Sequence, residues 1–176
     1  MLNLKMVLGA AVVAALVTGS ATAQDQSTNR VAAKTDWSVF VEDNPTECWG
    51  VSTPKQSVNT KDGRVVAVNR GQTLLMVFYR PSAGAKGQVA FTGGYPFASG
   101  STVNMNISGN TFELFTEGEW AWPATTDDDN KIITAMKRGA DAVLTARSGR
   151  GTQTKDTFSL LGFTSAVEDA AKRCGG

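Results

Sequence analysis

The chain has 176 residues, with 17 lysines and arginines against 16 acidic residues, so its formal net charge is only +1. It therefore lacks the excess of basic residues by which proteins bind nucleic acid or an anionic membrane surface, and we expect neither as a partner. The chain has no histidine, which excludes the common Ser-His-Asp and Cys-His catalytic arrangements and most zinc catalysis.

The first residues have the pattern of a secretory signal peptide. Lys5 precedes an unbroken apolar run at residues 6–17, and the small residues Ala21, Thr22 and Ala23 follow it. This order predicts a signal peptide over residues 1–23 that is cleaved after Ala23. A run of 12 apolar residues is too short for a helix that crosses a bilayer of about 30 Å. We therefore expect an exported protein without a transmembrane segment in its mature chain, located in the periplasm or else secreted or surface-associated.

Residues 24–36 are polar and aperiodic, which predicts a flexible leader. One domain is expected over residues 37–174, built from short strands between turn residues, with a tight turn at Gly109-Asn110. Two helices are predicted at residues 127–137 and 163–173, the second near the C-terminus. The strands are expected at residues 37–41, 48–51, 64–68, 73–79, 88–92, 103–108, 111–115, 142–147 and 157–161. The pattern indicates a mainly β fold, an antiparallel β-sandwich of about 8–9 strands with two short peripheral helices.

Both cysteines, Cys48 and Cys174, lie in the part of the chain that would remain after cleavage. In an oxidising compartment such a pair indicates a disulfide more often than two free thiols. A metal site is a poorer interpretation, because two thiols without histidine do not readily complete a four-ligand zinc centre. We assign no metal and no cofactor.

Glu117, Glu119, Trp120 and Trp122 form the candidate ligand surface. Paired acids beside aromatic platforms are typical of sugar-binding grooves and of glycosidases. The favoured interpretation is a strand with both tryptophans on one face and both glutamates in solvent on the other. A sugar site is the second interpretation and catalysis the last, so no catalytic residue is assigned.

A family resemblance is carried by Trp37-Ser38-Val39, by Glu47-Cys48 and above all by S-L-x-G-F-x-x-A at residues 159–166. With these motifs the chain resembles the invasion-associated locus B family of alphaproteobacterial exported proteins. The resemblance implies a small periplasmic or surface-associated β-sandwich without established catalytic residues, and links to host-cell entry in the founding members. Many members of this family carry a cysteine shortly after the first tryptophan, near the place of Phe40 here, that pairs with the one matching Cys48, which leaves Cys174 as the only candidate partner in this chain.

Together these features predict an exported non-enzymatic protein of the cell envelope that acts by binding or in a structural role. Its expected partner is an envelope or host-surface protein, or a glycan. The alternative is a carbohydrate-binding or carbohydrate-active domain centred on the candidate ligand surface. A third interpretation is an accessory inhibitor or chaperone-like subunit that uses an exposed sheet edge.

Overall fold

The computed structural model describes residues 28–174, and the expected signal peptide at residues 1–23 lies outside this range. Twelve strands form one antiparallel sheet in the order β1-β2-β3-β6-β7-β10-β9-β8-β11-β12-β4-β5. The strands are β1 (Arg30–Lys34), β2 (Trp37–Asp43), β3 (Thr46–Ser52), β4 (Gln56–Lys61), β5 (Arg64–Val65), β6 (Leu74–Arg80), β7 (Ala85–Thr92), β8 (Thr102–Ile107), β9 (Asn110–Glu117), β10 (Trp120–Trp122), β11 (Asp141–Arg147) and β12 (Gln153–Ser159). The helices are a 3-10 turn η1 (Pro81–Ala83), α1 (Thr126–Arg138) and α2 (Phe163–Arg173).

The mainly β, sandwich-like fold is confirmed, with more strands than the 8–9 expected. Three short strands account for the difference. Arg30–Lys34 lies in the expected leader but pairs with β2 as β1. Gln56–Lys61 pairs with β12 as β4, and Trp120–Trp122 forms β10. Each of these segments is half exposed and therefore contains few apolar residues. The hydrophobic pattern by which a strand is predicted from sequence is weak in all three.

A tight two-residue turn joins β8 and β9. In the β8–β9 hairpin, Ile107 pairs with Asn110, so the two-residue turn is Ser108-Gly109 and not the expected Gly109-Asn110. Ser108 and Gly109 have φ angles of 50° and 86°, as a type I′ turn requires. Moving the turn by one residue shifts the partner of Met105 by two positions, to Phe112, so the apolar side chains of β8 face the core with either turn.

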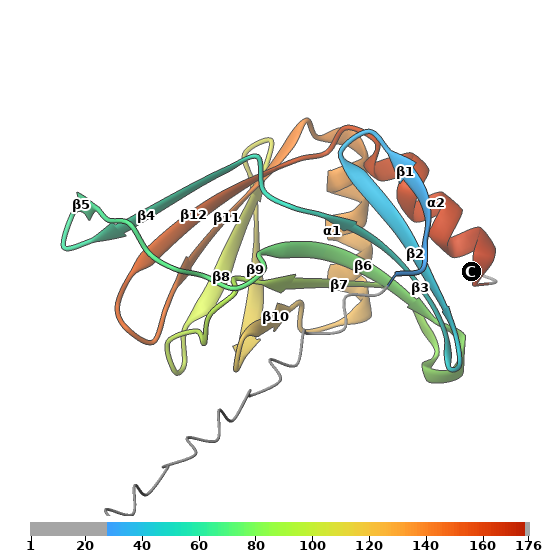
Figure 1. Cartoon of the computed structure of the whole chain (residues 1–176), viewed down its shortest axis with the longest axis horizontal. Coiled ribbons are helices and arrows are strands. Elements are labelled where there is room, and N and C mark those ends of the chain that lie inside the picture. Colours follow the sequence, from blue (N-terminus) through green and yellow to red (C-terminus); the bar gives the residue numbers. More distant parts are fainter. Residues whose placement is uncertain (1–27, 175–176) are drawn as a thin grey trace, which may run out of the picture.

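Both helices cover the inner face of the curved sheet, and the core lies between them and the sheet (Figure 1). Gly50 on β3 lies directly against α2, where a Cβ would be in ordinary van der Waals contact, 3.7 Å from Ala166 and from Val167. The indole Nε1 of Trp37 donates a hydrogen bond to the Ser159 carbonyl oxygen at 3.0 Å. These contacts join the first strands of the described chain to its last helix.

Helix α1 is held against β7 by a buried carboxylate. The Asp129 Oδ1 atom accepts a hydrogen bond from the backbone N–H of Val89 at 2.8 Å. Burial raises the pKa of Asp129, since desolvation disfavours its charged form. Neither α1 nor α2 has the length and apolar character needed to span a bilayer.

The chain between β5 and β6 is anchored across the inner face by a buried ion pair. The Arg70 Nη2 atom lies 2.6 Å from Asp156 Oδ2, and Nη1 lies 2.8 Å from Oδ1. The guanidinium also donates to the Gly93 carbonyl oxygen through Nε and lies over the Tyr95 ring. Ser57 Oγ completes the site by donating to Asp156 Oδ1 at 2.6 Å. We refer to this cluster of Arg70, Asp156, Ser57, Gly93 and Tyr95 as the arginine clamp.

Candidate functional site

The segment that carries the candidate ligand surface is a hairpin, not a single strand. Glu117 ends β9, Gly118 turns the chain with a φ angle of 59°, and Trp120 begins β10 directly opposite Glu117. Ala121 points into the core, so Trp120 and Trp122 both lie on the outer face of the sheet. The expectation that the acids occupy the face opposite the tryptophans is therefore wrong for Glu117, which is a cross-strand neighbour of Trp120.

Both tryptophans border a groove on the outer face of the sheet. The groove has a volume of about 340 Å³ and is lined by Phe78, Arg80, Gln88, Ala90, Trp120 and Trp122. We call these six residues the outer groove. They come from β6, β7 and β10, which are adjacent in the sheet although they are up to 44 positions apart in the sequence. Sequence reasoning found only its two tryptophans.

Arg80 is held rigidly on one side of the outer groove. Its Nε atom lies 3.1 Å from Glu47 Oε1, and its Nη1 donates to Gln88 Oε1 at 3.1 Å. The guanidinium carbon lies 4.2 Å from the centroid of the Phe78 ring, within the range of a cation–π contact. Because both long side chains are already ordered, a ligand that contacts Arg80 or Gln88 loses little of their conformational entropy.

The aromatic rings of the outer face fall into two sets. In the first, Phe40 stacks on Trp49 at 5.5 Å between centroids, and Trp49 contacts Phe78 at 5.9 Å. These rings cover one another across strands and stabilise the sheet.

The second set has no such cover. Within residues 28–174, no ring contact joins Trp120, Trp122 or Phe115 to another aromatic ring. Trp120 is 40% exposed and Phe115, opposite Trp122 on β9, is 49% exposed. These three side chains therefore offer aromatic surface to a ligand. The alternation of buried and exposed residues along β9 is the sequence signal that could have added Phe115 to the candidate ligand surface.

The outer groove has the chemistry of a binding site. Its lining contains no acid and no nucleophile, and the nearby Glu117 and Glu119 are solvent-exposed. No cluster of three or more potential metal ligands occurs among residues 28–174. The groove thus combines flat aromatic surface with one amide and one fixed guanidinium.

A second, larger pocket of about 540 Å³ lies between α1 and the β8–β9 hairpin. Its apolar lining includes Ile107 and Phe112, and its cationic rim includes Lys131 and Arg138. Lys131 is already paired with Asp128 at 2.9 Å. Because the one aromatic ring of this pocket, Phe112, is packed against the core, we favour the outer groove as the candidate site.

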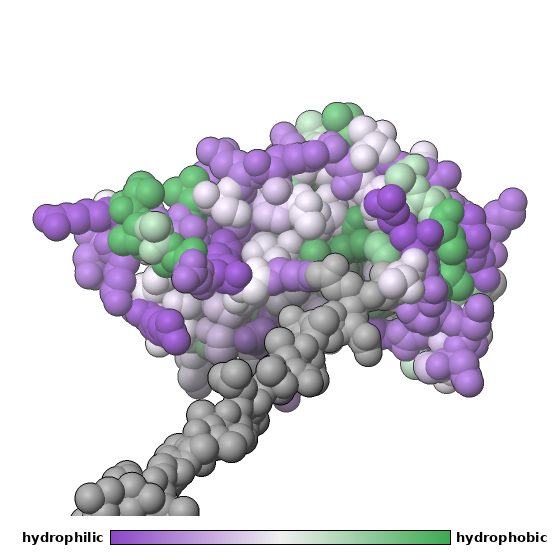
Figure 2. All heavy atoms as spheres, in the orientation of Figure 1, coloured by the Kyte–Doolittle hydropathy of each residue, from purple (hydrophilic) through white to green (hydrophobic). Residues whose placement is uncertain are grey.

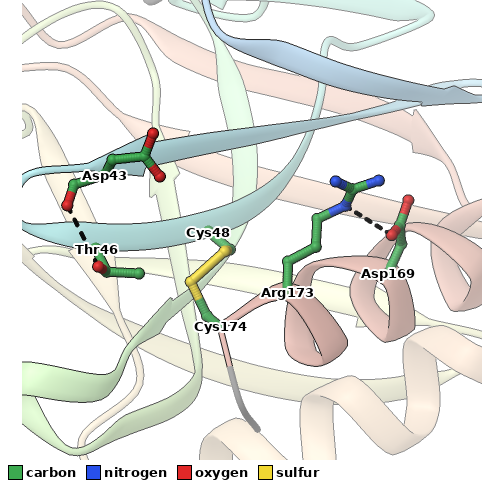
Figure 3. Close-up of a disulfide and its surroundings, with 6 residues drawn as sticks. All are labelled: Asp43, Thr46, Cys48, Asp169, Arg173 and Cys174. Carbon is green, nitrogen blue, oxygen red and sulfur yellow. Dashed lines mark hydrogen bonds and ion pairs between the residues drawn. A yellow bond between two sulfur atoms is a disulfide. The ribbon is translucent and has the colours of Figure 1, made fainter.

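The predicted disulfide is confirmed. Cys48 on β3 and Cys174 at the end of α2 are bonded, with Cα atoms 5.9 Å apart and 126 positions between them in the sequence (Figure 3). The preceding turn of α2 carries an ion pair between Arg173 Nε and Asp169 Oδ1 at 2.8 Å. The bond holds the C-terminal end of α2 against the half of the sheet that also carries Glu47, the partner of Arg80.

Fold and site together describe a small, disulfide-linked β protein whose outer sheet face carries an aromatic groove. The chain belongs to the Invasion associated locus B (IalB) protein family, whose family model matches residues 37–171. Among solved structures it is similar to the invasion associated protein B of Bartonella henselae. The two chains are 14% identical, with a TM-score of 0.57 over 82% of this chain and 98% of the other. At that identity the similarity shows the fold alone. No curated protein sequence matches significantly.

Proposed function

We propose that this protein is an exported, non-enzymatic binding protein of the cell envelope that holds its partner in the outer groove. Family membership supports the class, and the observation that carries the site is the uncovered ring of Trp120 beside the fixed guanidinium of Arg80. Tryptophan and arginine are the residues most enriched among those that dominate binding energy at protein interfaces. The name of the Bartonella protein supports an envelope or host-surface protein as the partner.

A carbohydrate is the second candidate ligand. The free faces of Trp120 and Trp122 can stack on the apolar face of a sugar ring, while Gln88 offers an amide and Glu117 a carboxylate at the side. This arrangement supports binding of a glycan and not its cleavage, because none of the six residues that line the outer groove is a carboxylate.

Crosslinking of the purified protein to a periplasmic extract and to host-cell membranes, followed by mass spectrometry, tests the first candidate. The variant Trp120→Ala should lose the crosslinked partner, whereas Leu161→Ala, which removes an apolar side chain exposed elsewhere, should keep it. Retention of the partner by both variants would contradict the proposed site. Quenching of tryptophan fluorescence by chitohexaose or by soluble peptidoglycan fragments would instead support the carbohydrate.

The stability of the Trp120→Ala/Trp122→Ala variant separates a ligand surface from a packing role. Loss of a fully buried tryptophan costs about 3–5 kcal/mol. Since Trp120 is 40% exposed and Trp122 half-buried, we expect an intermediate loss for the pair. An unchanged melting temperature would contradict any packing role and would favour the sugar platform.

Export is tested by the intact mass of the protein from fractionated cells. We expect a mature chain in the periplasm that begins at Gln24. A mass that still includes residues 1–23 would contradict cleavage at the expected site.

A further inference from the structure

Strand β5 forms one end of the sheet and leaves a free edge. Among the strands of residues 28–174 it pairs only with β4, through Thr60 with Val65 and Lys61 with Arg64. The two strands are joined by Asp62-Gly63, whose φ angles of 50° and 75° form a type I′ turn. No strand within residues 28–174 lies on the other side of β5.

The backbone of this segment offers unpaired hydrogen-bonding groups. The Val66 N–H donates to the Asn59 carbonyl oxygen at 2.9 Å, so these residues form a hydrogen-bonded pair. Because such pairs alternate in an antiparallel ladder, the N–H and C=O groups of Val65 point away from β4. The chain then leaves β4, and no backbone hydrogen bond within residues 28–174 engages the N–H groups of Ala67 and Val68.

The same segment is apolar and exposed. Residues 64–68 (RVVAV) were expected to form a full strand, yet only Arg64–Val65 is paired as one. Val65 is 77% exposed and Val68 is 38% exposed. Figure 2 shows hydrophobic atoms at the end of the molecule where Figure 1 places β5. Exposed apolar residues of high β propensity at an unpaired edge are a template for another strand.

The charges at this edge select the kind of strand. Lys61 and Arg64 face each other directly across the β4–β5 ladder, an arrangement of like charges that is unfavourable. Neither cation has an ion-pair partner within residues 28–174, and the neighbouring Asp62 pairs with neither. A second copy of this edge would add two more cations, whereas an acidic strand would neutralise those present.

We propose that β5 is a strand-addition site for an extended segment of a partner protein in which acidic and apolar residues alternate. Side chains alternate between the two faces of a sheet. Lys61 and Arg64 share the inner face with Ser57 and Asn59, and Val65 lies on the outer face. An added strand therefore places acidic side chains beside Arg64 and apolar ones beside Val65. This edge is separate from the outer groove, so the proposal for one surface can be refuted while the proposal for the other stands.

The test uses a capped synthetic peptide of about six residues, the usual length of a strand, in which valine and glutamate alternate. Its counterpart replaces every glutamate with lysine. Backbone amide NMR of the full mature chain should show shifts in β4, β5 and residues 66–68 with the glutamate peptide only. Absence of these shifts, equal binding of both peptides, or shifts confined to the outer groove would overturn the proposal.

Variants separate the contributions of charge and of apolar contact. The double variant Lys61→Glu/Arg64→Glu should weaken the glutamate peptide by about fivefold or more and gain binding of the lysine peptide. Val65→Ser should also weaken binding. The matched control Val31→Ser, at the opposite edge of the sheet and 43% exposed, should not change it. If the wild type self-associates in a concentration-dependent way and Val65→Ser abolishes this, the edge binds a second copy of the chain. That result would overturn the proposal of a different partner protein.

Discussion

Replacing one member of the arginine clamp at a time should destabilise the protein more than replacing both. Asp156 is fully buried and the Arg70 side chain is 10% exposed. The two are joined by parallel hydrogen bonds of 2.6 and 2.8 Å, the bidentate geometry that makes arginine–carboxylate pairs strong. The change Asp156→Leu leaves the guanidinium buried beside an apolar side chain, and Arg70→Met leaves the carboxylate without its countercharge.

The structure allows the magnitudes to be estimated. Removing one partner of a buried ion pair costs about 3–5 kcal/mol, whereas replacing the whole pair with apolar residues of similar volume is often close to neutral. Arg70 keeps its bond from Nε to the Gly93 carbonyl oxygen when Asp156 is lost, so about 3 kcal/mol is the more realistic value for Asp156→Leu. The double variant still forfeits the bonds to Ser57 and Gly93, so we expect it to lose about 1–2 kcal/mol.

Urea unfolding at neutral pH, followed by tryptophan fluorescence and by circular dichroism, measures all four proteins of this double-mutant cycle. The decisive comparison is the order of stability, with the double variant above both single variants. Single losses below about 1 kcal/mol, or a double loss equal to their sum, would refute the assignment of an energetically coupled buried pair. An altered dependence on urea concentration would indicate that the unfolded or native state had also changed.

Four further variants test what stabilises the fold. Replacing Cys48 and Cys174 with alanine removes a bond that closes a loop of 126 positions, and should lower the unfolding free energy by about 4–5 kcal/mol at most. Hydrogen exchange in α2 should become faster. A loss of stability below about 1 kcal/mol would contradict this prediction. Gly139→Ala should lower the free energy of unfolding, measured in urea, by about 1–3 kcal/mol, because its Cβ would lie 2.6 Å from Ile107 Cγ2. An unchanged urea midpoint would show that the end of α1 can move to make room for the methyl group. Asp129→Asn should gain stability over wild type as pH rises from 3.8 to the raised pKa of Asp129, because burial raises that pKa and the carboxyl ionises in the unfolded state before it ionises in the native state. Asp169→Asn should show the opposite slope, losing stability relative to wild type as pH rises towards 3.8, because the hydrogen bond from Arg173 lowers the pKa of Asp169; equal slopes for both variants would refute the two assignments.

Local patterns were sufficient for much of the fold. The helix expected at residues 163–173 has those bounds, because an apolar stripe and a C-terminal pair of basic residues are signals within one short segment. The strands expected at residues 37–41, 48–51 and 73–79 match the bounds of β2, β3 and β6 to within two residues, since continuous or alternating apolar runs reflect burial directly. The disulfide could be predicted because only two cysteines exist to be paired.

The outer groove could be predicted only in part. Trp120 and Trp122 were visible as a pair in the sequence, but Phe78, Arg80 and Gln88 reach them only through the order β6-β7-β10 in the sheet. That order depends on pairings between segments far apart in the chain, for which no local pattern is a signal.

The sequence by itself determined that the protein is mainly β, that a disulfide is available to it, and which tryptophans a ligand could meet. These properties depend on residue types and on spacings of a few positions, which local physical chemistry governs. Only the tertiary structure decided which aromatic rings remain uncovered, that Arg70 and Asp156 neutralise each other in the interior, and that β5 ends the sheet with no further strand from residues 28–174 beside it. Each of these depends on what packs against a residue from a distant part of the chain, and burial of this kind exists only once the sheet has formed.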